Sequence, residues 1–293
     1  MGKHAYLIMA HSNFQQLKRL IAALDDERND IYIHVDKKAK DFQEDGWTTK
    51  KANLTFIPSM NVSWGGRSQI VCELELLKAA VYKKMYAYYH LISGQDLPIK
   101  SQDEIHAFFK KNQGKCYMDF DRKDIKTENF LYKIQYWYPF QEYIGRNKDG
   151  KAEKLDWLQN KLLLLQKKLK YSRRKGTEKK YYKGANWFSI TDELARYVLS
   201  KEKEIYEEYA CTLCADEIFL HTLAMNSIYA QNVVPDSLRE IDWKRGNPYV
   251  FGLEDYEKLM RSKAMFARKF QDQIDDRIID KIIDTIQIDK KDV

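Results

Sequence analysis

The chain has 293 residues, 44% hydrophobic and 13% aromatic, which is enough apolar material for a packed core and excludes a largely disordered protein. Its net charge is +7, and no apolar run approaches the roughly 20 residues that cross a bilayer. The first residues also lack the order of a cleavable secretion signal. We therefore expect a cytoplasmic protein that is soluble or peripheral to the inner face of a membrane.

The first half alternates apolar runs of strand length with stretches of helical periodicity. In chain order these predict a strand over 5–10, a helix over 13–24, strands over 31–35 and 54–57, a helix over 69–82 and a strand over 88–92. This order predicts an α/β fold with a mostly parallel central sheet flanked by helices. Such sheets bind ligands at the carboxyl ends of their strands, where Asp36 and the loop 93–98 fall.

The second half is less regular. Its patterns predict strands over 117–120 and 187–190, helices over 192–199 and 216–227, a short strand over 249–251 and a helix over 255–261. No linker rich in Pro, Gly or Ser divides the chain. We therefore predict one domain over 1–293.

Residues 148–183 hold much of the positive charge and form an excursion from that domain. Within them, apolar residues recur at helical spacing and predict an amphipathic helix with a cationic face; they are Trp157, Leu158, Leu162, Leu165 and Leu169. Two interpretations stay open: a solvated helix that packs one side on the domain, or a helix that docks on an anionic membrane. No nucleic-acid-binding motif accompanies the charge, so we expect no nucleic-acid partner.

The four cysteines are scattered, and we interpret them as free thiols. Cys211 and Cys214 form a C-x-x-C, but no second pair or suitably spaced histidines complete a zinc site. We expect no metal or redox role for them.

Seven stretches follow one another as HAYLIMAHSN, IYIHVDKKA, VSWGGRSQI, YYHLISGQDLPIKS, KGANWFSIT, ADEIFLHTLAMNS and FARKF. Together they resemble the core-2/I-branching N-acetylglucosaminyltransferase family, glycosyltransferase family 14, which also contains peptide O-xylosyltransferases. The resemblance spans nearly the whole chain. It implies a GT-A-like fold, with a nucleotide-binding half over 1–115 and an acceptor-binding and catalytic half over 116–293.

Four donor-binding residues follow from the resemblance and from residue chemistry. Asp36 takes the place of the acid that meets the uridine, although Asp also caps turns. Asp96 stands where metal-dependent relatives of the fold carry D-x-D, but it is a single acid, so it orients donor hydroxyls or fixes its loop. Arg67 is a candidate for donor phosphate or a surface arginine, and Trp187 is a sugar-facing ring or a core residue.

Further donor contacts surround the phosphates. Gly184 suits a tight turn in a stretch where Ala185 replaces the family's commoner serine. Lys269 matches the family's phosphate-binding lysine, with Arg268 beside it. Arg245 is the nearest basic residue to the family's partner arginine. Fixed cations of this kind can neutralise the leaving pyrophosphate without a divalent ion.

Glu217 matches the family's catalytic base, and a positioned carboxylate can take the proton of an acceptor hydroxyl. The alternative is an ordinary acid pair, Asp216-Glu217, at a helix N-terminus. For the acceptor we predict Asp216, Asp119 and two aromatic residues, Tyr132 and Trp137.

Asp119 and Asp121 form a literal D-x-D, which keeps a metal-dependent alternative open. The leading prediction is nevertheless an inverting enzyme that uses no metal or other cofactor. It moves a sugar, first of all N-acetylglucosamine, from a UDP-sugar to a hydroxyl of a glycan. UDP-xylose is the alternative donor, and a non-catalytic glycan-binding or membrane-surface protein of the same fold is the alternative class.

Overall fold

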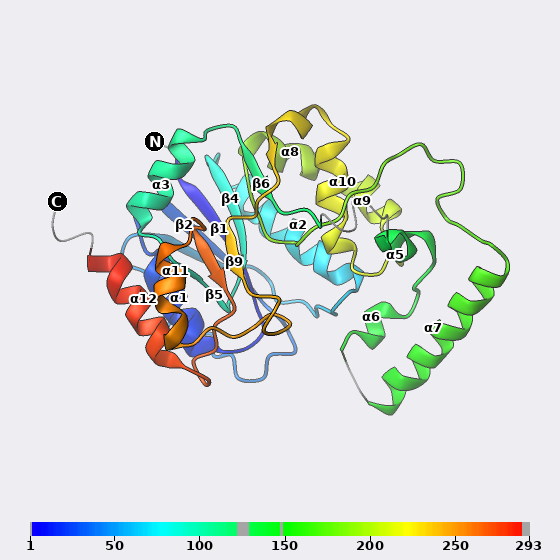
Figure 1. Cartoon of the computed structure of the whole chain (residues 1–293), viewed down its shortest axis with the longest axis horizontal. Helices are drawn as coiled ribbons and strands as arrows, with labels where there is room; N and C mark the ends of the chain where they lie inside the picture. Colours follow the sequence, from blue (N-terminus) through cyan, green and yellow to red (C-terminus); the bar gives the residue numbers. More distant parts are fainter. Residues whose placement is uncertain (1, 122–128, 147–148, 289–293) are drawn as a thin grey trace.

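The computed structural model describes residues 2–121, 129–146 and 149–288 (Figure 1). Its centre is a seven-stranded sheet in the order β3(Asn53–Phe56), β2(Asn29–Val35), β1(His4–Ala10), β4(Tyr88–Ser93), β7(Phe188–Ile190), β6(Cys116–Met118), β8(Val233–Val234). The first four are parallel, β7 is antiparallel to β4 and β6, and β8 is parallel to β6. The predicted α/β fold with a mostly parallel sheet is confirmed.

Strand β1 shows why the central strands are apolar at nearly every position. Ala5 and Leu7 point into one core cluster, whereas Tyr6 and Ile8 point into the other, and all four are fully buried. Side chains alternate between the faces of a strand, so a strand covered on both faces must be apolar at every position.

Helices cover both faces of this sheet (Figure 1). One core cluster takes residues from α2(Arg67–Val81), α8(Asp192–Ser200), α9(Glu202–Glu208) and α10(Phe219–Met225). The other takes residues from α1(Phe14–Leu24), α3(Gln102–Lys111), α11(Tyr256–Arg261) and α12(Asp276–Ile288). Leu17, Leu20, Ile21 and Leu24 form the buried stripe of α1, as their spacing predicts.

A second, three-stranded sheet has the order β5(Asp96–Pro98), β10(Phe266–Arg268), β9(Arg239–Ile241). Its antiparallel pair sets Arg268 directly opposite Asp96. Three-residue strands carry too little periodicity to be found from sequence. The strand predicted over 249–251 is wrong: that segment is not part of either sheet, although Phe251 donates its N–H to the Lys269 carbonyl.

The predicted helix over 216–227 is divided. It consists of a short turn, η2(Ala215–Glu217), followed by α10. The remaining 3-10 turns are η1(Asn129–Leu131), η3(Ile228–Asn232) and η4(Leu253–Asp255).

Between β6 and β7 lie α5(Tyr132–Gln135), α6(Gln141–Ile144) and α7(Gly150–Lys168). Helix α7 is the helix of the basic excursion, and it lies at the far end of the molecule from α12 (Figure 1). The Asp149 carboxylate caps α7 by accepting from the N–H groups of Lys151 and Ala152. Among the described helices, none is both long enough and apolar enough to span a membrane.

Candidate active site

The carboxyl ends of β1, β2 and β4 meet at one edge of the sheet. Asp36 donates its N–H to the Ala10 carbonyl at 2.8 Å, and Gly94 donates to the Met9 carbonyl at 3.0 Å. The Asp36 carboxylate accepts from the N–H of Lys38 at 2.9 Å, so it caps its own turn. This turn-capping role and a role in donor binding are compatible, because a carboxylate oxygen can accept more than one hydrogen bond.

Asp96 is fully buried and fixes its loop. It accepts hydrogen bonds from the N–H and hydroxyl of Ser93, at 3.0 and 2.8 Å. Arg268 Nη1 donates to Asp96 Oδ1 at 2.8 Å and also to the Ser93 hydroxyl. The Arg268 guanidinium lies 4.5 Å from the centre of the Trp187 ring. The loop-fixing interpretation of Asp96 therefore fits its contacts, and Trp187 serves as a packing surface for Arg268.

Lys269 lies among other cations. Burial lowers its pKa, and the positive charges of Arg268 and Arg146 lower it further. Burial also lowers the pKa of His11, with Asp36 opposing this shift and the same three cations adding to it. We call His11, Arg146, Arg268 and Lys269 the basic cluster. Cations gathered at the end of a parallel sheet are suited to an anionic ligand.

Arg146 follows α6, just before the basic excursion, and reaches this edge. Its guanidinium lies 4.9 Å from the centre of the Trp64 ring, in the glycine-containing loop before α2. Gln141 donates to the Trp64 carbonyl at 3.0 Å, and Lys38 donates to the Val62 carbonyl at 2.6 Å. These contacts hold the loop between α6 and the turn after β2.

Two predicted donor cations lie in other environments. Arg245 is bound to Asp242 at 2.8 Å and to Asp255 at 2.6 Å. Two carboxylates thus neutralise its charge, and we withdraw its assignment to donor phosphate. Arg67 stacks on the Tyr206 ring of α9 at 4.8 Å, which favours the interpretation as a surface arginine.

Glu217 lies in η2, and its side chain is 31% exposed. Lys133 of α5 donates to its Oε2 at 2.7 Å, and the Lys183 ammonium is 3.5 Å from the same oxygen. Within the described part of the chain, Oε1 has neither a hydrogen bond nor an ion pair. One oxygen is thus fixed by cations, and the other is left for a hydroxyl.

Gly184 permits a close approach of chain segments beside Glu217. It donates its N–H to the Glu217 carbonyl at 3.0 Å. A Cβ at this position would lie 1.8 Å from the Asp119 carbonyl oxygen and 2.6 Å from His221 Nε2. No side chain larger than hydrogen fits there. Its observed role is therefore to bring segment 183–187 against the end of β6.

The segment 183–187 connects the two charged groups. Lys183 lies beside Glu217, whereas Trp187 lies beneath Arg268. Four peptide steps extend at most about 14 Å. A segment of five residues therefore links the candidate base to the basic cluster.

Asp216 and Glu73 form a buried acid pair behind Glu217. Gln69 donates to Asp216 Oδ2 at 2.8 Å and also accepts from the Gly65 N–H, whereas Asp216 Oδ1 has no partner among described residues. Burial, then Glu217, raise the pKa of Asp216 to about 7. Burial is the main cause that raises the pKa of Glu73, and the charge of Asp216 raises it further. Asn186 lies near the Glu73 carboxyl group but makes no hydrogen bond of normal geometry with it. Asp216 is thus too buried to be an open acceptor contact.

The other predicted acceptor residues are partly engaged. Asp119 is exposed and accepts from its neighbour's N–H at 2.9 Å. Trp137 donates to the Tyr171 hydroxyl at 2.9 Å and has Arg173 3.8 Å above its ring, whereas Tyr132 is half exposed beside Lys133. Across 2–121, 129–146 and 149–288, no group of three or more His, Cys, Asp or Glu side chains has the arrangement of a metal site.

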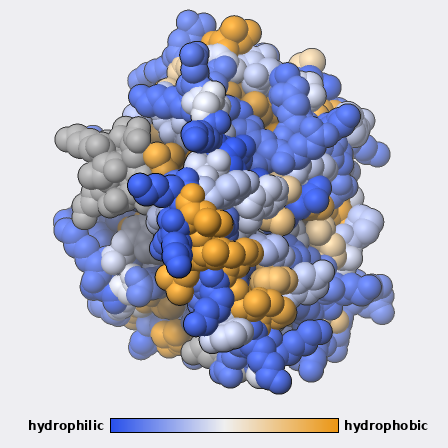
Figure 2. Space-filling model, turned by 90° about the vertical axis from the view of Figure 1, so that its right-hand side faces the viewer, coloured by the Kyte–Doolittle hydropathy of each residue, from blue (hydrophilic) through white to orange (hydrophobic). Residues whose placement is uncertain are grey.

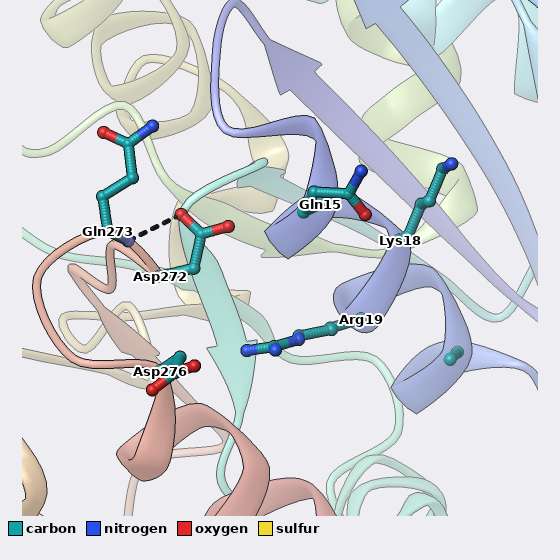
Figure 3. A pocket seen from close by; sticks show the side chains of 7 residues that line it. Gln15, Lys18, Arg19, Asp272, Gln273 and Asp276 are labelled. Atoms are coloured by element: carbon teal, nitrogen blue, oxygen red, sulfur yellow. Dashed lines mark hydrogen bonds between the residues drawn. The ribbon is translucent and has the colours of Figure 1, made fainter.

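A pocket of about 540 Å³ opens between α1 and the start of α12 (Figure 3). In the close-up, Arg19 extends from α1 toward the side that carries Asp276. Acidic and basic side chains line it together, and none of them is a predicted site residue.

The chain matches the model of a known protein family over most of its length. The family model described as "Branch: Core-2/I-Branching enzyme" matches residues 4–260. The chain belongs to the Core-2/I-Branching enzyme family. The predicted resemblance is thereby confirmed, because the match covers the sheet, the basic excursion and Glu217.

Curated relatives of this Core-2/I-Branching chain are named as xylosyltransferases. Xylosyltransferase 2 of Homo sapiens is 24% identical over 304 residues, which cover 92% of this chain and 32% of that protein. Xylosyltransferase sqv-6 of Caenorhabditis elegans is 25% identical over 301 residues, 90% of this chain and 34% of that protein. The chain thus spans about a third of the length of these relatives. The solved galactosyltransferase LgtC is 10% identical with a TM-score of 0.44, covering 96% of this chain and 95% of that chain.

Sequence reasoning missed four basic residues of this candidate site. His11 and Lys183 lie within the stretches that carry the resemblance, and their position there could have marked them. Lys133 and Arg146 lie in the irregular second half, where no motif or periodicity distinguishes them from other basic residues. Their positions depend on how α5 and α6 fold back on the sheet.

Proposed function

We propose that this protein is an inverting glycosyltransferase that moves a sugar from a UDP-sugar to a hydroxyl of a glycan without a metal ion. The observation that supports it best is the pairing of Glu217 with the basic cluster at the two ends of segment 183–187. A carboxylate and an anion site linked in this way fit a GT-A-like nucleotide-sugar site, with an acceptor at one end and a pyrophosphate at the other.

In the proposed reaction, Glu217 Oε1 accepts the proton of the acceptor hydroxyl. The hydroxyl oxygen attacks the anomeric carbon from the face opposite to UDP, and a new C–O bond forms. The bond between that carbon and the phosphate oxygen breaks, and its electron pair leaves with UDP. Lys133 and Lys183 keep the Glu217 carboxylate oriented, so they are positioning residues.

The leaving UDP gains negative charge as this bond breaks. Lys269 and Arg146 are suited to neutralise it, because neither makes an ion pair with a carboxylate among the described residues. Arg268, by contrast, is held by Asp96 and acts by supporting the loop 93–98. Fixed cations cost no reorganisation at the moment of reaction.

Two donors remain in the proposal. N-acetylglucosamine follows from the family resemblance, and xylose is favoured by the names of the curated relatives. Calorimetric titration with UDP-N-acetylglucosamine, UDP-xylose and UDP, followed by UDP release on adding glycan acceptors, tests both. If UDP and all UDP-sugars fail to bind, the proposed function is wrong.

We also propose a second partner, an anionic membrane surface, for the basic excursion of a protein located in the cytoplasm. Lys161, Lys167, Lys168 and Lys170 support this because they lie exposed around one end of α7. Vesicle binding tests this partner independently of UDP release.

A further inference from the structure

Helix α7 exposes its large apolar side chains instead of burying them. Its outer face consists of residues at positions three, four and seven apart, which are Lys154, Trp157, Leu158, Lys161, Leu164, Leu165, Lys168 and Leu169. Trp157 is 62% exposed, Leu164 60%, Leu165 52% and Leu169 68%. Figure 2 faces this end of the molecule and shows hydrophobic side chains gathered in a patch among hydrophilic ones.

Polar side chains, by contrast, attach α7 to the rest of the protein. Gln159 and Gln166 are buried on its inner side. Gln166 accepts from the Trp137 N–H at 2.8 Å and donates to the Trp137 carbonyl at 3.2 Å. Gln159 accepts from the Phe140 N–H at 3.2 Å. Helix α7 thus packs one side on the domain, but that side carries the glutamines, and Trp157, Leu158, Leu165 and Leu169 lie on the exposed side.

This arrangement is the reverse of an ordinary surface helix, which turns its apolar stripe toward the core. No described part of the protein buries the tryptophan and the leucines on the outer face, so packing within the chain does not explain them. Contiguous exposed apolar residues of this kind mark a surface that another apolar phase covers.

The charge on the face indicates which phase that is. Lys154, Lys161 and Lys168 recur every seven residues along the middle of the apolar stripe. Residues 150–175 contain nine lysines and arginines against two acids, Glu153 and Asp156. A second copy of the same face would bring lysine stripes together, which opposes association.

An anionic bilayer, by contrast, suits both kinds of side chain. Leucines can enter the acyl boundary while lysine stems lie along the apolar surface and extend their ammonium groups to phosphates. Trp157, with the Lys161 ammonium 5.4 Å from its ring, carries the amphipathic ring that favours the depth of the headgroups.

We propose that the outer face of α7 docks on an anionic phospholipid surface, with the helix axis parallel to the membrane and the buried glutamines facing the protein. This identifies the surface and the side chains of the membrane contact proposed above. It does not depend on which sugar is transferred.

Two triple variants of the full-length protein separate the apolar and electrostatic contributions. One carries Leu158→Ser, Leu164→Ser and Leu165→Ser, which leaves every charge in place. The other carries Lys154→Gln, Lys161→Gln and Lys168→Gln, which leaves the apolar side chains in place. The matched control removes three exposed lysines from elsewhere on the surface, as Lys111→Gln, Lys203→Gln and Lys263→Gln.

Flotation with vesicles of phosphatidylcholine, alone or mixed with phosphatidylglycerol, measures the bound fraction. We expect wild type to bind only the mixed vesicles and each α7 variant to partition at least about tenfold more weakly. The control should stay within about twofold of wild type, because lysines away from the bilayer contribute little through a Debye length of about 8 Å. Thermal unfolding should show that all variants are folded, since the replaced side chains are exposed.

Three results would overturn the proposal. One is equal binding of wild type to neutral and mixed vesicles, and another is an equal loss in the control and α7 variants. The third is a concentration-dependent dimer in sedimentation velocity that disappears in the serine variant, because a second copy would then cover the face. UDP release with a soluble acceptor, measured on the same samples, reports on the proposed enzyme activity separately.

Discussion

The two ends of the site use cations in opposite ways. Around Glu217, Lys133 and Lys183 contact a single carboxylate oxygen, so their charges orient an acid. Around Lys269, burial and the charges of Arg268 and Arg146 lower the pKa of its ammonium group, and at His11 Asp36 is the acid that opposes such a shift. The first arrangement is complete within the protein, whereas the second gains most when an anion arrives. This difference is the physical basis for assigning acceptor activation to one end and pyrophosphate to the other.

The Glu217 end gives the largest expected effect. Glu217→Gln should lower turnover by about a hundredfold or more, because the amide keeps the shape but cannot take the acceptor proton. Binding of UDP, measured by calorimetry, should stay within about threefold of wild type, since the basic cluster is unchanged. Near-normal turnover in this variant would show that Glu217 is not the general base. The assignment of different roles to the two ends of the site would then fail.

At the Lys269 end, a substitution should weaken UDP binding and slow sugar transfer together. Lys269→Ala should weaken UDP binding and slow transfer by roughly tenfold to a hundredfold, because the charge that it meets is present in the donor and grows as the bond breaks. Arg245→Ala is the matched control, since its partners Asp242 and Asp255 already neutralise that cation. If Arg245→Ala weakened UDP binding as much as Lys269→Ala, our correction of Arg245 would be wrong.

The sequence predicted those parts of the fold and of the candidate site that do not depend on pairing between distant segments of the chain. The parallel strands and α1 follow from apolar runs and helical spacing, and the resemblance indicated Glu217 and Lys269 as candidate site residues. The opposition of Arg268 to Asp96 could not be predicted, because it depends on pairing three-residue strands from distant parts of the chain. Periodicity also located α7, but it could not tell which face meets the protein, because glutamine hydrogen bonds rather than leucine burial attach it.

The acid pair behind Glu217 should make stability depend on pH. Glu73 and Asp216 both have raised pKa values in the fold, about 7 for Asp216, so both retain protons that the unfolded chain releases near pH 4. The stability that these protonated groups contribute is therefore fully present below about pH 4 and is lost as pH rises through their raised pKa values, of which that of Asp216 lies at about 7. Glu73→Gln should stabilise the protein clearly more at pH 8 than at pH 5, as measured by chemical denaturation.

Glu75→Gln is the control on the same helix, because Glu75 is exposed and pairs with Lys78. It should show no such difference between the two pH values. Equal destabilisation by Glu73→Gln at both pH values would mean that Glu73 is needed as a charged group, contrary to its lack of hydrogen-bond partners.

The smallest expected effect is the response to a chelator, and it decides whether the Lys269 end is sufficient for the leaving group. If Lys269 and Arg146 neutralise the pyrophosphate, transfer should continue in excess EDTA at a rate within about twofold of the untreated enzyme. Asp96 cannot readily take over as a metal ligand, because Arg268 and Ser93 already occupy its carboxylate. The alternative ligands are Asp119 and Asp121, although Lys183 lies 3.5 Å from Asp121 and competes for its charge. Loss of activity in EDTA with recovery in manganese would place the leaving-group charge on a metal held by these acids. Residues 119–121 would then replace Lys269 and Arg146 as the part of the site that neutralises the leaving UDP.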